Sequence, residues 1–420
     1  MTMRILYLSQ YFPPEAGATQ TRAYEMARNW VRLGHTVTMI AEIPNHPSGI
    51  IPPAYRGKLY ERSTLEGIEV IRVWVAASPV KNFRTRMLFY LTYMLNAFLA
   101  GIFLARGRFD LIYASSPPRF VGAAALGLSW LKRIPLVFEV RDLWPESAVA
   151  LGELRSPRVI SLATRLEEAC YRRARLIVVV TDGILQNLVR RGIPGEKLSF
   201  IPNGANVDLF QFTSEGRQRI RRELGLEGKF IAIYAGIHGV AQGLETLLEA
   251  ARLLQDDLDI HILMVGDGPE KARISALADR LALSGLTLLS EKPRNEIPAY
   301  LSAADVSIIP LRNLDLFKGA LPSKMFDAWA CERPVVISVD GEARQVLEQA
   351  QGGVFVAPED APSLARTLRD LKANPEARLR MGKSGRSFTQ QFYSRQAQAE
   401  KLAARLQSIQ SSPPPKDAGF

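Results

Sequence analysis

Cysteine and histidine are scarce in this chain of 420 residues, which holds two cysteines and four histidines. Cys170 and Cys331 both fall in helical patterns, which predicts a reducing compartment and no disulfide framework. The histidines show no metal-ligand spacing, so the sequence predicts no zinc site. They are His35, His46, His238 and His261.

A signal-peptide layout is also missing at the beginning of the sequence, where Met1–Arg4 leads into a short apolar run. We therefore expect a cytoplasmic protein. Its hydrophobic content of 47% and charged content of 23% are typical of a globular chain. The length suits two or three domains.

Acidic residues are few in the first half, although the chain as a whole carries a net charge of +11. Residues 1–200 contain 26 basic and 15 acidic residues, whereas residues 201–420 contain 27 of each. This asymmetry predicts an anionic partner for the first half, such as an acidic membrane surface or a phosphorylated acceptor. The basic residues do not cluster with aromatic ones in a nucleic-acid-binding motif, so we expect no nucleic-acid partner.

Short apolar runs alternate with helical patterns along the first half. A helix is expected from about Thr19 to Leu33, ended by Gly34. Such alternation predicts a doubly wound α/β domain. The predicted strands lie at 4–8, 36–40, 111–113, 136–140 and 176–180.

The turn-rich segment Ile201–Asn206 reads as a hinge, and a second alternating series follows it. Its strands are predicted at 230–234, 260–265, 287–289, 306–309 and 335–338. The predicted fold is α/β, with two Rossmann-like doubly wound parallel-sheet domains that face each other across a cleft. We expect domains at 1–200 and 205–385, a helix at about 387–410 that rejoins the first domain, and a disordered tail at 411–420.

One segment departs from this alternation: Met87–Ala105 holds 19 residues without a charge. Three readings remain open for it, namely a buried or groove-forming helix, an interfacial membrane helix, and a membrane span. The flanking arginines suit anionic headgroups. They are Arg84, Arg86, Arg106 and Arg108.

Three glycine-containing loops each follow a predicted strand and open a helix, at 13–19, 234–245 and 265–270. Glycines at a helix start expose N–H groups to an anion. A further helix is expected to begin at Pro322, which places Lys324 in its first turn and Asp327 on the same face. The positive end of the helix dipole repels a lysine ammonium placed beside it, unless an anion binds at the same site.

Together these residues resemble the family-four retaining glycosyltransferases of the GT-B fold, over nearly the whole chain. The motifs that carry the resemblance are Ile201–Gly204, Val265–Pro269, Ala304–Val306 with Pro310, and Pro322–Asp327. Val140–Ser147 and Gly239–Leu244 look like a bacterial subgroup that builds surface polysaccharides and includes N-acetyl-L-fucosamine transferases.

The resemblance implies that the second domain binds a nucleotide-diphosphate sugar, in which uridine is the base, and that the first domain binds an acceptor. Lys324 would contact the diphosphate and stabilise the leaving group, and Asp327 would contact the ribose hydroxyls. The expected donor-binding residues are Gly17, Gly236, His238, Gly239, Gly266, Asp267, Gly268, Arg312, Ser323, Lys324 and Asp327.

Two departures from the family pattern affect the donor site. Gly319 stands where the family's Glu-x7-Glu motif begins, so the contact normally made there to the sugar is absent or supplied differently. Ile237, His238 and Gln242 occupy a loop in which many members place arginine and lysine. Lys324 and backbone amides must then carry more of the phosphate charge, with help from Arg312.

A third departure lies in the first domain, where Arg141 and Asp142 stand in place of a histidine found in many relatives. An acidic side chain can accept the acceptor's proton, so Asp142 is the first candidate base and Glu146 the second. The competing interpretation is that Arg141 and Asp142 pair to hold the loop, and that Trp144 fills core.

The predicted activity is retaining, metal-independent transfer of an N-acetylated amino sugar or deoxy sugar from a UDP-sugar, with no cofactor. The predicted acceptor is a polyprenyl-diphosphate-linked saccharide at the inner face of the cell membrane, in O-antigen or capsule synthesis. Asp257-Leu258-Asp259 matches the Asp-x-Asp pattern that metal-dependent transferases use. It lies just before a predicted strand, at the wrong edge of a parallel sheet, so we expect a solvated turn there. The alternatives are a sugar-nucleotide epimerase on the same fold and a catalytically inactive sugar-nucleotide-binding protein.

Overall fold

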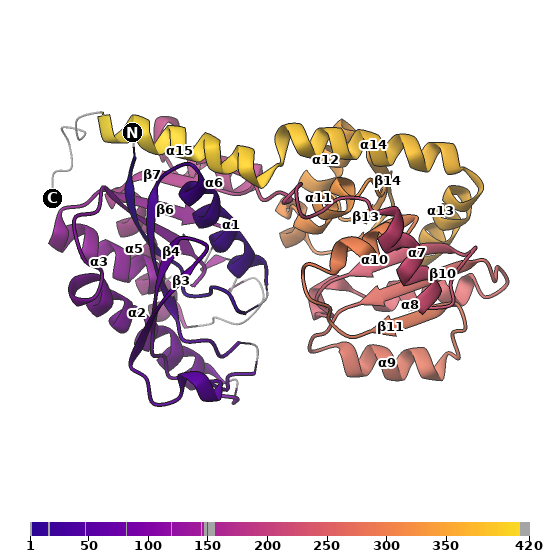
Figure 1. Cartoon of the computed structure of the whole chain (residues 1–420), viewed down its shortest axis with the longest axis horizontal. Coiled ribbons are helices and arrows are strands. Elements are labelled where there is room, and N and C mark those ends of the chain that lie inside the picture. The colour runs from indigo at the N-terminus through magenta and orange to yellow at the C-terminus, as the bar shows by residue number, and fades with distance from the viewer. Residues whose placement is uncertain are drawn as a thin grey trace. The chain divides into compact units, whose positions relative to one another are not determined.

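The protein is described by a computed structural model, which covers residues 2–15, 17–46, 48–80, 82–118, 120–143, 145–146, 149 and 156–411. It divides into two units, Met1–Pro202 with Gln398–Phe420, and Asn203–Ala397 (Figure 1). Trp144 and the predicted disordered tail beyond Ser411 lie outside the described residues.

The first unit is built on an eight-stranded sheet in the order β3-β4-β2-β1-β5-β6-β7-β8. All neighbouring strands pair in parallel except β3 and β4, which are antiparallel. The strands are β1 Arg4–Leu8, β2 Thr36–Glu42, β3 Tyr60–Leu65, β4 Ile68–Val73, β5 Leu111–Ser116, β6 Leu136–Val140, β7 Ala174–Val179 and β8 Leu198–Phe200.

Helices cover both faces of this sheet (Figure 1). Alternate residues of β1 enter opposite cores, with Ile5 and Tyr7 on one side and Leu6 and Leu8 on the other, which explains the uninterrupted apolar run in the sequence. The helices are α1 Ala18–Arg32, α2 Phe83–Phe103, α3 Phe120–Lys132, α5 Pro157–Arg173, α6 Asp182–Arg190 and α15 Arg395–Ser411.

Helix α15 returns to the first unit at the end of the chain. Trp30 of α1 donates from Nε1 to the carbonyl oxygen of Ala399 at 3.2 Å, and Leu402 and Leu406 are fully buried in the same core. The unit is therefore closed by a segment far from it in sequence.

Helix α2, which contains the uncharged segment, is held by one face only. Tyr93 is buried and donates to the carbonyl oxygen of Ile40 at 2.9 Å, and a Cβ at Gly101 would collide with Leu128 of α3. The other face is exposed, and it carries Leu88, Leu91, Leu95, Leu99 and Phe103. By length and composition alone α2 could cross a membrane, with 22% of its most apolar window buried.

The second unit holds a six-stranded parallel sheet in the order β11-β10-β9-β12-β13-β14. The strands are β9 Phe230–Ala235, β10 Ile260–Val265, β11 Leu286–Leu289, β12 Val306–Pro310, β13 Val335–Ser338 and β14 Gly353–Phe355. The helices are α7 Ser214–Glu223, α8 Glu245–Leu253, α9 Lys271–Arg280, α10 Ile297–Ala303, α11 Ser323–Ala330, α12 Glu342–Ala350, α13 Ala361–Ala373 and α14 Pro375–Phe392.

The predicted fold class, two doubly wound parallel α/β domains, is confirmed by these two sheets. Strands β1, β6, β10 and β13 have the predicted bounds. The predicted strand list lacked β3, β4, β8 and β14. Strand β3 is an edge strand whose four central residues, 61–64, are all polar, and β8 and β14 have three residues each, so none of these three presents an apolar run.

Candidate active site

Glycine loops bring two strand ends of the second unit into backbone contact. Gly236 follows β9 with φ 147°, and Gly266 follows β10 with φ 154°, a region that favours glycine. A Cβ on Gly266 would lie 1.9 Å from the carbonyl oxygen of Gly236. The two loops therefore approach as closely as they do only because Gly266 has no side chain.

The next residues extend this contact. His238 donates its backbone N–H to the carbonyl oxygen of Asp267 at 2.8 Å, and its own carbonyl oxygen accepts from Glu270 N at 2.9 Å. A Cβ on Gly268 would lie 2.6 Å from that same His238 oxygen. Asp267 closes the turn by accepting Gly268 N at 2.7 Å through Oδ1. The loop holding Gly239 is thus fixed against the start of α9.

Lys324 of α11 reaches these loops, since its Nζ lies 2.0 Å from the position that a Cβ on Gly236 would take. The ammonium donates to Tyr234 Oη at 2.9 Å and lies 4.4 Å from the centre of that ring. Burial lowers the pKa of Lys324 to about 8, although Asp327 acts in the opposite sense. A partly desolvated ammonium beside a glycine loop is an arrangement that an anion would stabilise.

His238 is fully buried, and neither ring nitrogen has a hydrogen-bond partner within the described part of the chain. Burial, with Lys271 and Lys324 nearby, lowers its pKa to about 4. The imidazole is therefore neutral at physiological pH. It can still donate one hydrogen bond and accept another.

The other residues predicted for this site lie close in the chain. Ser323 begins α11, and Asp327 lies one turn further along the same helix. Gly319 lies in a short helical segment, Asp315–Gly319, where a Cβ would meet nothing within 4 Å. Space for a side chain thus exists at the position where the family pattern has glutamate.

Arg312 follows β12 and is already engaged. Its Nε donates to the carbonyl oxygen of Val240 at 2.7 Å, and its guanidinium pairs with Glu245 at 3.0 Å and Glu359 at 3.5 Å. It joins the second half of the β9 loop to the end of β12. Its charge is shared between two carboxylates before any ligand binds.

The aspartates at 257 and 259 precede β10, at the opposite edge of the sheet from the glycine loops. Lys372 of α13 pairs with Asp257 at 2.5 Å and with Asp259 at 3.4 Å. Within the described ranges no group of three or more His, Cys, Asp and Glu side chains could hold a metal ion.

In the first unit, the predicted catalytic residues follow the carboxyl end of β6. Neither Nε nor Nη1 of Arg141 is hydrogen-bonded to Asp142 or to any other described residue, and both atoms are buried. Glu146 is exposed and lies 3.6 Å from Arg191. Gly17, predicted to bind the donor, belongs to this unit and precedes α1.

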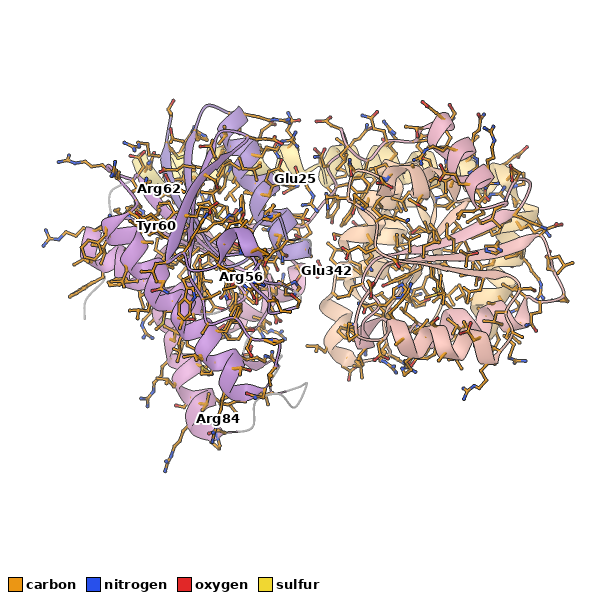
Figure 2. All side chains as sticks on the ribbon, turned by 60° about the horizontal axis from the view of Figure 1, so that its bottom comes forward. Glu25, Arg56, Tyr60, Arg62, Arg84 and Glu342 are labelled. Carbon is orange, nitrogen blue, oxygen red and sulfur yellow. The ribbon has the colours of Figure 1, made fainter. Side chains whose placement is uncertain are left out.

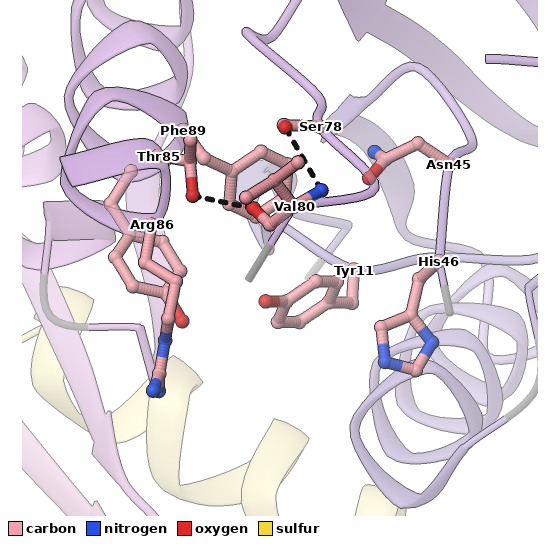
Figure 3. A pocket seen from close by; sticks show the side chains of 9 residues that line it. Tyr11, Asn45, His46, Ser78, Val80, Thr85, Arg86 and Phe89 are labelled. Carbon is pink, nitrogen blue, oxygen red and sulfur yellow. Dashed lines mark hydrogen bonds between the residues drawn. The ribbon is translucent and has the colours of Figure 1, made fainter. Parts of the chain in front are cut away.

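The same edge of the first sheet contains a cavity of about 340 Å³ (Figure 3). It lies among the loops after β1, β2 and β4 and the first two turns of α2. Its wall combines aromatic rings, small polar groups and one guanidinium. The lining residues are Tyr11, Asn45, His46, Ser78, Val80, Thr85, Arg86, Phe89 and Tyr90.

Buried Glu15 fixes one wall of this cavity. Its Oε1 accepts the backbone N–H groups of Asn45 and His46, each at 2.6 Å. Burial raises the pKa of this carboxyl group, although the two N–H groups act in the opposite sense. On the other side, Thr85 donates to the carbonyl oxygen of Val80 at 2.6 Å (Figure 3). The cavity is therefore shaped before any ligand enters.

Sequence reasoning missed Tyr234 and the whole cavity. Tyr234 sits inside a β-strand run and reads as core, yet its hydroxyl is the acceptor for Lys324. The cavity residues come from three loops and one helix. The available signal was their shared position after parallel strands, where ligands bind in such folds.

Comparisons with known proteins show what the two parts of the chain resemble. Residues 17–204 match the family model described as "Glycosyl transferase 4-like domain", and residues 216–388 match "Glycosyl transferases group 1". The chain is 24% identical over 383 residues to WcaI of Escherichia coli strain K12, whose name assigns it to colanic acid biosynthesis as a glycosyl transferase. That match covers 89% of this chain and 93% of the relative.

Many solved structures share the fold. One is a sucrose-phosphate synthase from Thermosynechococcus elongatus, with a TM-score of 0.75, 20% identity, and coverage of 97% of this chain and 99% of that one. Another is Anabaena Alr3699/HepE in complex with UDP and glucose, with a TM-score of 0.71, 18% identity, and coverage of 97% and 100%.

The fold and the paired family matches define a glycosyltransferase of the GT-B fold. Within that class, the chain belongs to the group 1 glycosyltransferases of family four.

Proposed function

We propose that this protein is a retaining glycosyltransferase that moves a sugar from a UDP-sugar to a lipid-linked saccharide in the synthesis of a surface polysaccharide. The observation that carries the proposal is the Lys324 ammonium held over the glycine loops of the second unit. The UDP bound to the Anabaena protein supports the donor, and the pathway for which WcaI is named supports the process.

In the proposed reaction the protein itself forms no covalent bond to the sugar. The bond between the sugar C1 and the diphosphate oxygen breaks, and its electron pair stays on that oxygen. A bond forms between C1 and the acceptor oxygen, which loses its proton. Lys324 and the amides of the Gly236 loop stabilise the charge that develops on the diphosphate, and Asp327 contacts the ribose. No residue need form a covalent intermediate.

Asp142 is the proposed acceptor of the proton, because it follows β6 at the carboxyl edge of the first sheet. Glu146 is the second candidate, and it is an exposed carboxylate that lies 3.6 Å from Arg191. The variants Asp142→Asn and Glu146→Gln separate the two. The base is the residue whose variant loses turnover while UDP affinity remains that of the wild type.

The test of the proposed function measures UDP release from a panel of UDP-sugars, with and without a lipid-diphosphate-linked acceptor. We expect release only with acceptor, and we expect Lys324→Ala to lower turnover about a hundredfold. Lys318→Ala is the matched control, since Lys318 is exposed and pairs with Asp315 on the same short helical segment. Wild-type turnover in Lys324→Ala would refute the assigned role.

Two alternatives predict different results in the same assay. An epimerase converts the sugar nucleotide without acceptor, and a binding protein retains UDP-sugar without turnover. The departures at Gly319 and at Arg141-Asp142 motivate the second alternative. Either result, obtained with the wild-type protein, would replace the transferase proposal.

The cavity of the first unit is the proposed acceptor pocket. Tyr11 and Tyr90 offer flat faces to a sugar ring, and Arg86 offers a guanidinium to a phosphate. The first two turns of α2 line this pocket, so a lipid-linked acceptor bound there would place its headgroup beside the helix with the exposed leucine face.

That leucine face is the proposed contact with an anionic membrane surface. Leu88, Leu91, Leu95 and Leu99 recur at helical spacing on the exposed side of α2. Arg84 lies at one end of the helix and points away from the fold (Figure 2), while Arg106 and Arg108 are exposed just beyond the other end. Apolar burial together with basic residues near headgroups describes an interfacial helix.

Flotation with vesicles of neutral or anionic lipid tests this contact. The double variant Leu91→Gln/Leu95→Gln should lower binding to anionic vesicles about tenfold or more, because two side chains no longer enter lipid. Leu162→Gln removes an exposed leucine from α5 and is the control. Equal flotation of all three proteins would exclude α2 as the contact.

A further inference from the structure

A charge cluster under the carboxyl edge of the first sheet holds two guanidinium groups, one buried and one half-buried, and one buried carboxylate. Glu139 of β6 is fully buried and accepts from Arg22 Nε at 2.9 Å and Tyr113 Oη at 2.7 Å through Oε1. Its Oε2 accepts from Ser115 at 2.5 Å. Both carboxylate oxygens are therefore already used.

Arg22 is fully engaged as well. Besides Glu139, it donates to the carbonyl oxygens of Ile201 at 2.8 Å and Pro202 at 3.1 Å. It thus joins α1, β6 and the end of the first unit. Arg22 and Glu139 together form a neutral, hydrogen-bonded pair.

Arg141 is the second guanidinium, and it lies beyond Glu139 where β6 ends. Its charge acts on Glu139, yet its buried Nε and Nη1 have no acceptor among the described residues. The nearby Tyr7 and Tyr113 are neutral, because burial holds their pKa well above the usual value. One positive charge is left over, with N–H donors unmatched.

Leaving these two buried N–H groups without an acceptor is costly, because neither water nor a protein acceptor replaces their hydration. Arg141 lies at the edge of the parallel sheet where ligands bind in such folds. An oxyanion of a ligand is the hydrogen-bond acceptor that a guanidinium prefers. We propose that Arg141 binds an oxyanion of the acceptor, either its phosphate or a sugar carboxylate, and so positions the acceptor at the end of β6.

This inference rests on the proposed function and adds a specific recognition contact to it. Pyrophosphate and glucuronate serve as probes for the two sources of the oxyanion. Because Lys324 is also expected to bind pyrophosphate, calorimetry on the full-length protein compares wild type, Lys324→Ala, Arg141→Gln and the double variant. We expect two pyrophosphate sites in the wild type, one in each single variant and none in the double variant.

Glucuronate separates the sources. Glucuronate binding that is lost in Arg141→Gln, while the number of pyrophosphate sites stays the same as in the wild type, assigns a carboxylate to Arg141. Loss of one pyrophosphate site assigns a phosphate. If Arg141→Gln loses neither glucuronate binding nor a pyrophosphate site, the proposed site is refuted, whatever the transfer assay shows. The calorimetry therefore stays decisive even if no sugar transfer is found.

Kinetics and stability supply the second arm. Arg141→Gln should raise the acceptor KM about 10- to 100-fold, as expected for a lost charged hydrogen bond, with UDP affinity within about twofold of wild type. It should not lower Tm, because the native guanidinium lacks partners, whereas Arg22→Gln should lower it. An equal loss of Tm in both variants, or a change in UDP affinity instead of acceptor KM, would overturn the proposal.

Discussion

Each unit contains a carboxylate beside two arginines, and the two clusters differ in how the second positive charge is balanced. In the second unit, Asp305 pairs with Arg217 and Arg221, each at 2.7 Å, and accepts Ile231 N at 2.8 Å. In the first unit, Glu139 pairs with Arg22, and the guanidinium of Arg141 stays without an acceptor at Nε and Nη1.

The end of helix α10 explains the difference. Arg217 donates to the carbonyl oxygens of residues 302, 303 and 304 at 3.0, 3.2 and 2.9 Å, and Arg221 donates to residue 303 at 2.8 Å. These carbonyls form the negative end of the helix and balance the excess charge. No such helix end contacts Arg141 in the part of the chain that the structure describes. The same composition therefore makes a closed structural cluster in one unit and an open site in the other.

Removing the carboxylate is the most severe way to test this comparison. Asp305→Asn and Glu139→Gln should each lower the free energy of unfolding by about 3–5 kcal/mol, because each leaves buried arginines without a counter-ion. Urea unfolding measures the effect. Adding Arg141→Gln should partly restore Glu139→Gln, since it removes the excess charge. If Arg141→Gln instead deepens the loss, Arg141 does not carry a surplus charge in this cluster.

Closing the glycine loops should abolish the donor site with little effect on the first unit. Gly236→Ala forces a Cβ to within 2.0 Å of Lys324 Nζ at a φ of 147°, so we expect UDP affinity to fall about a hundredfold or more. Calorimetry with UDP measures this. Gly195→Ala, where a Cβ meets nothing within 4 Å, is the control and should bind normally. Normal UDP binding in Gly236→Ala would remove these loops from the donor site.

The pH dependence of UDP binding should follow Lys324. Its pKa of about 8 rises when an anion binds, so UDP affinity should be highest near pH 7 and fall about tenfold per pH unit well above pH 8. The phosphates of UDP are already ionised there. Lys324→Ala should show a flat profile over the same range. A wild-type profile that is equally flat would contradict the assigned contact.

The smallest effect is expected at His238. A buried neutral imidazole that hydrogen-bonds the donor should contribute about fivefold to UDP affinity, as a neutral hydrogen bond does. Because its pKa is about 4, the contribution should not change between pH 6 and 8. If His238→Ala binds UDP with unchanged affinity, the imidazole ring has only a packing role.

Much of the proposed donor site can be predicted from local sequence. The glycines at 236, 266 and 268 and the lysine at 324 each sit in a strand-loop-helix pattern, which fixes their place at the carboxyl edge. Tyr234 escaped notice because a tyrosine within a strand gives no sign that its hydroxyl reaches another element. The tie between Arg312 and two carboxylates was equally hidden, since its partners lie 67 and 47 residues away.

For the apolar segment at 87–105, the sequence pattern alone could not decide the environment of the helix. Its composition allowed a core helix, an interfacial helix or a span, and those differ in which side chains meet protein. Tyr93 and Gly101 bury one face, and the leucines at 91 and 95 remain exposed. That distribution depends on neighbours from β2 and α3, which the segment does not encode.

By itself the sequence determined the two α/β series, the glycine loops and the lysine that meets them, because hydrophobic period, turn chemistry and helix starts are local properties. The tertiary structure alone decided which charges are balanced and which cavity forms. Whether Arg141 finds an acceptor depends on groups brought together from β6, α1 and β5 across more than a hundred residues of chain, and Coulomb and hydrogen-bond energies depend on those distances.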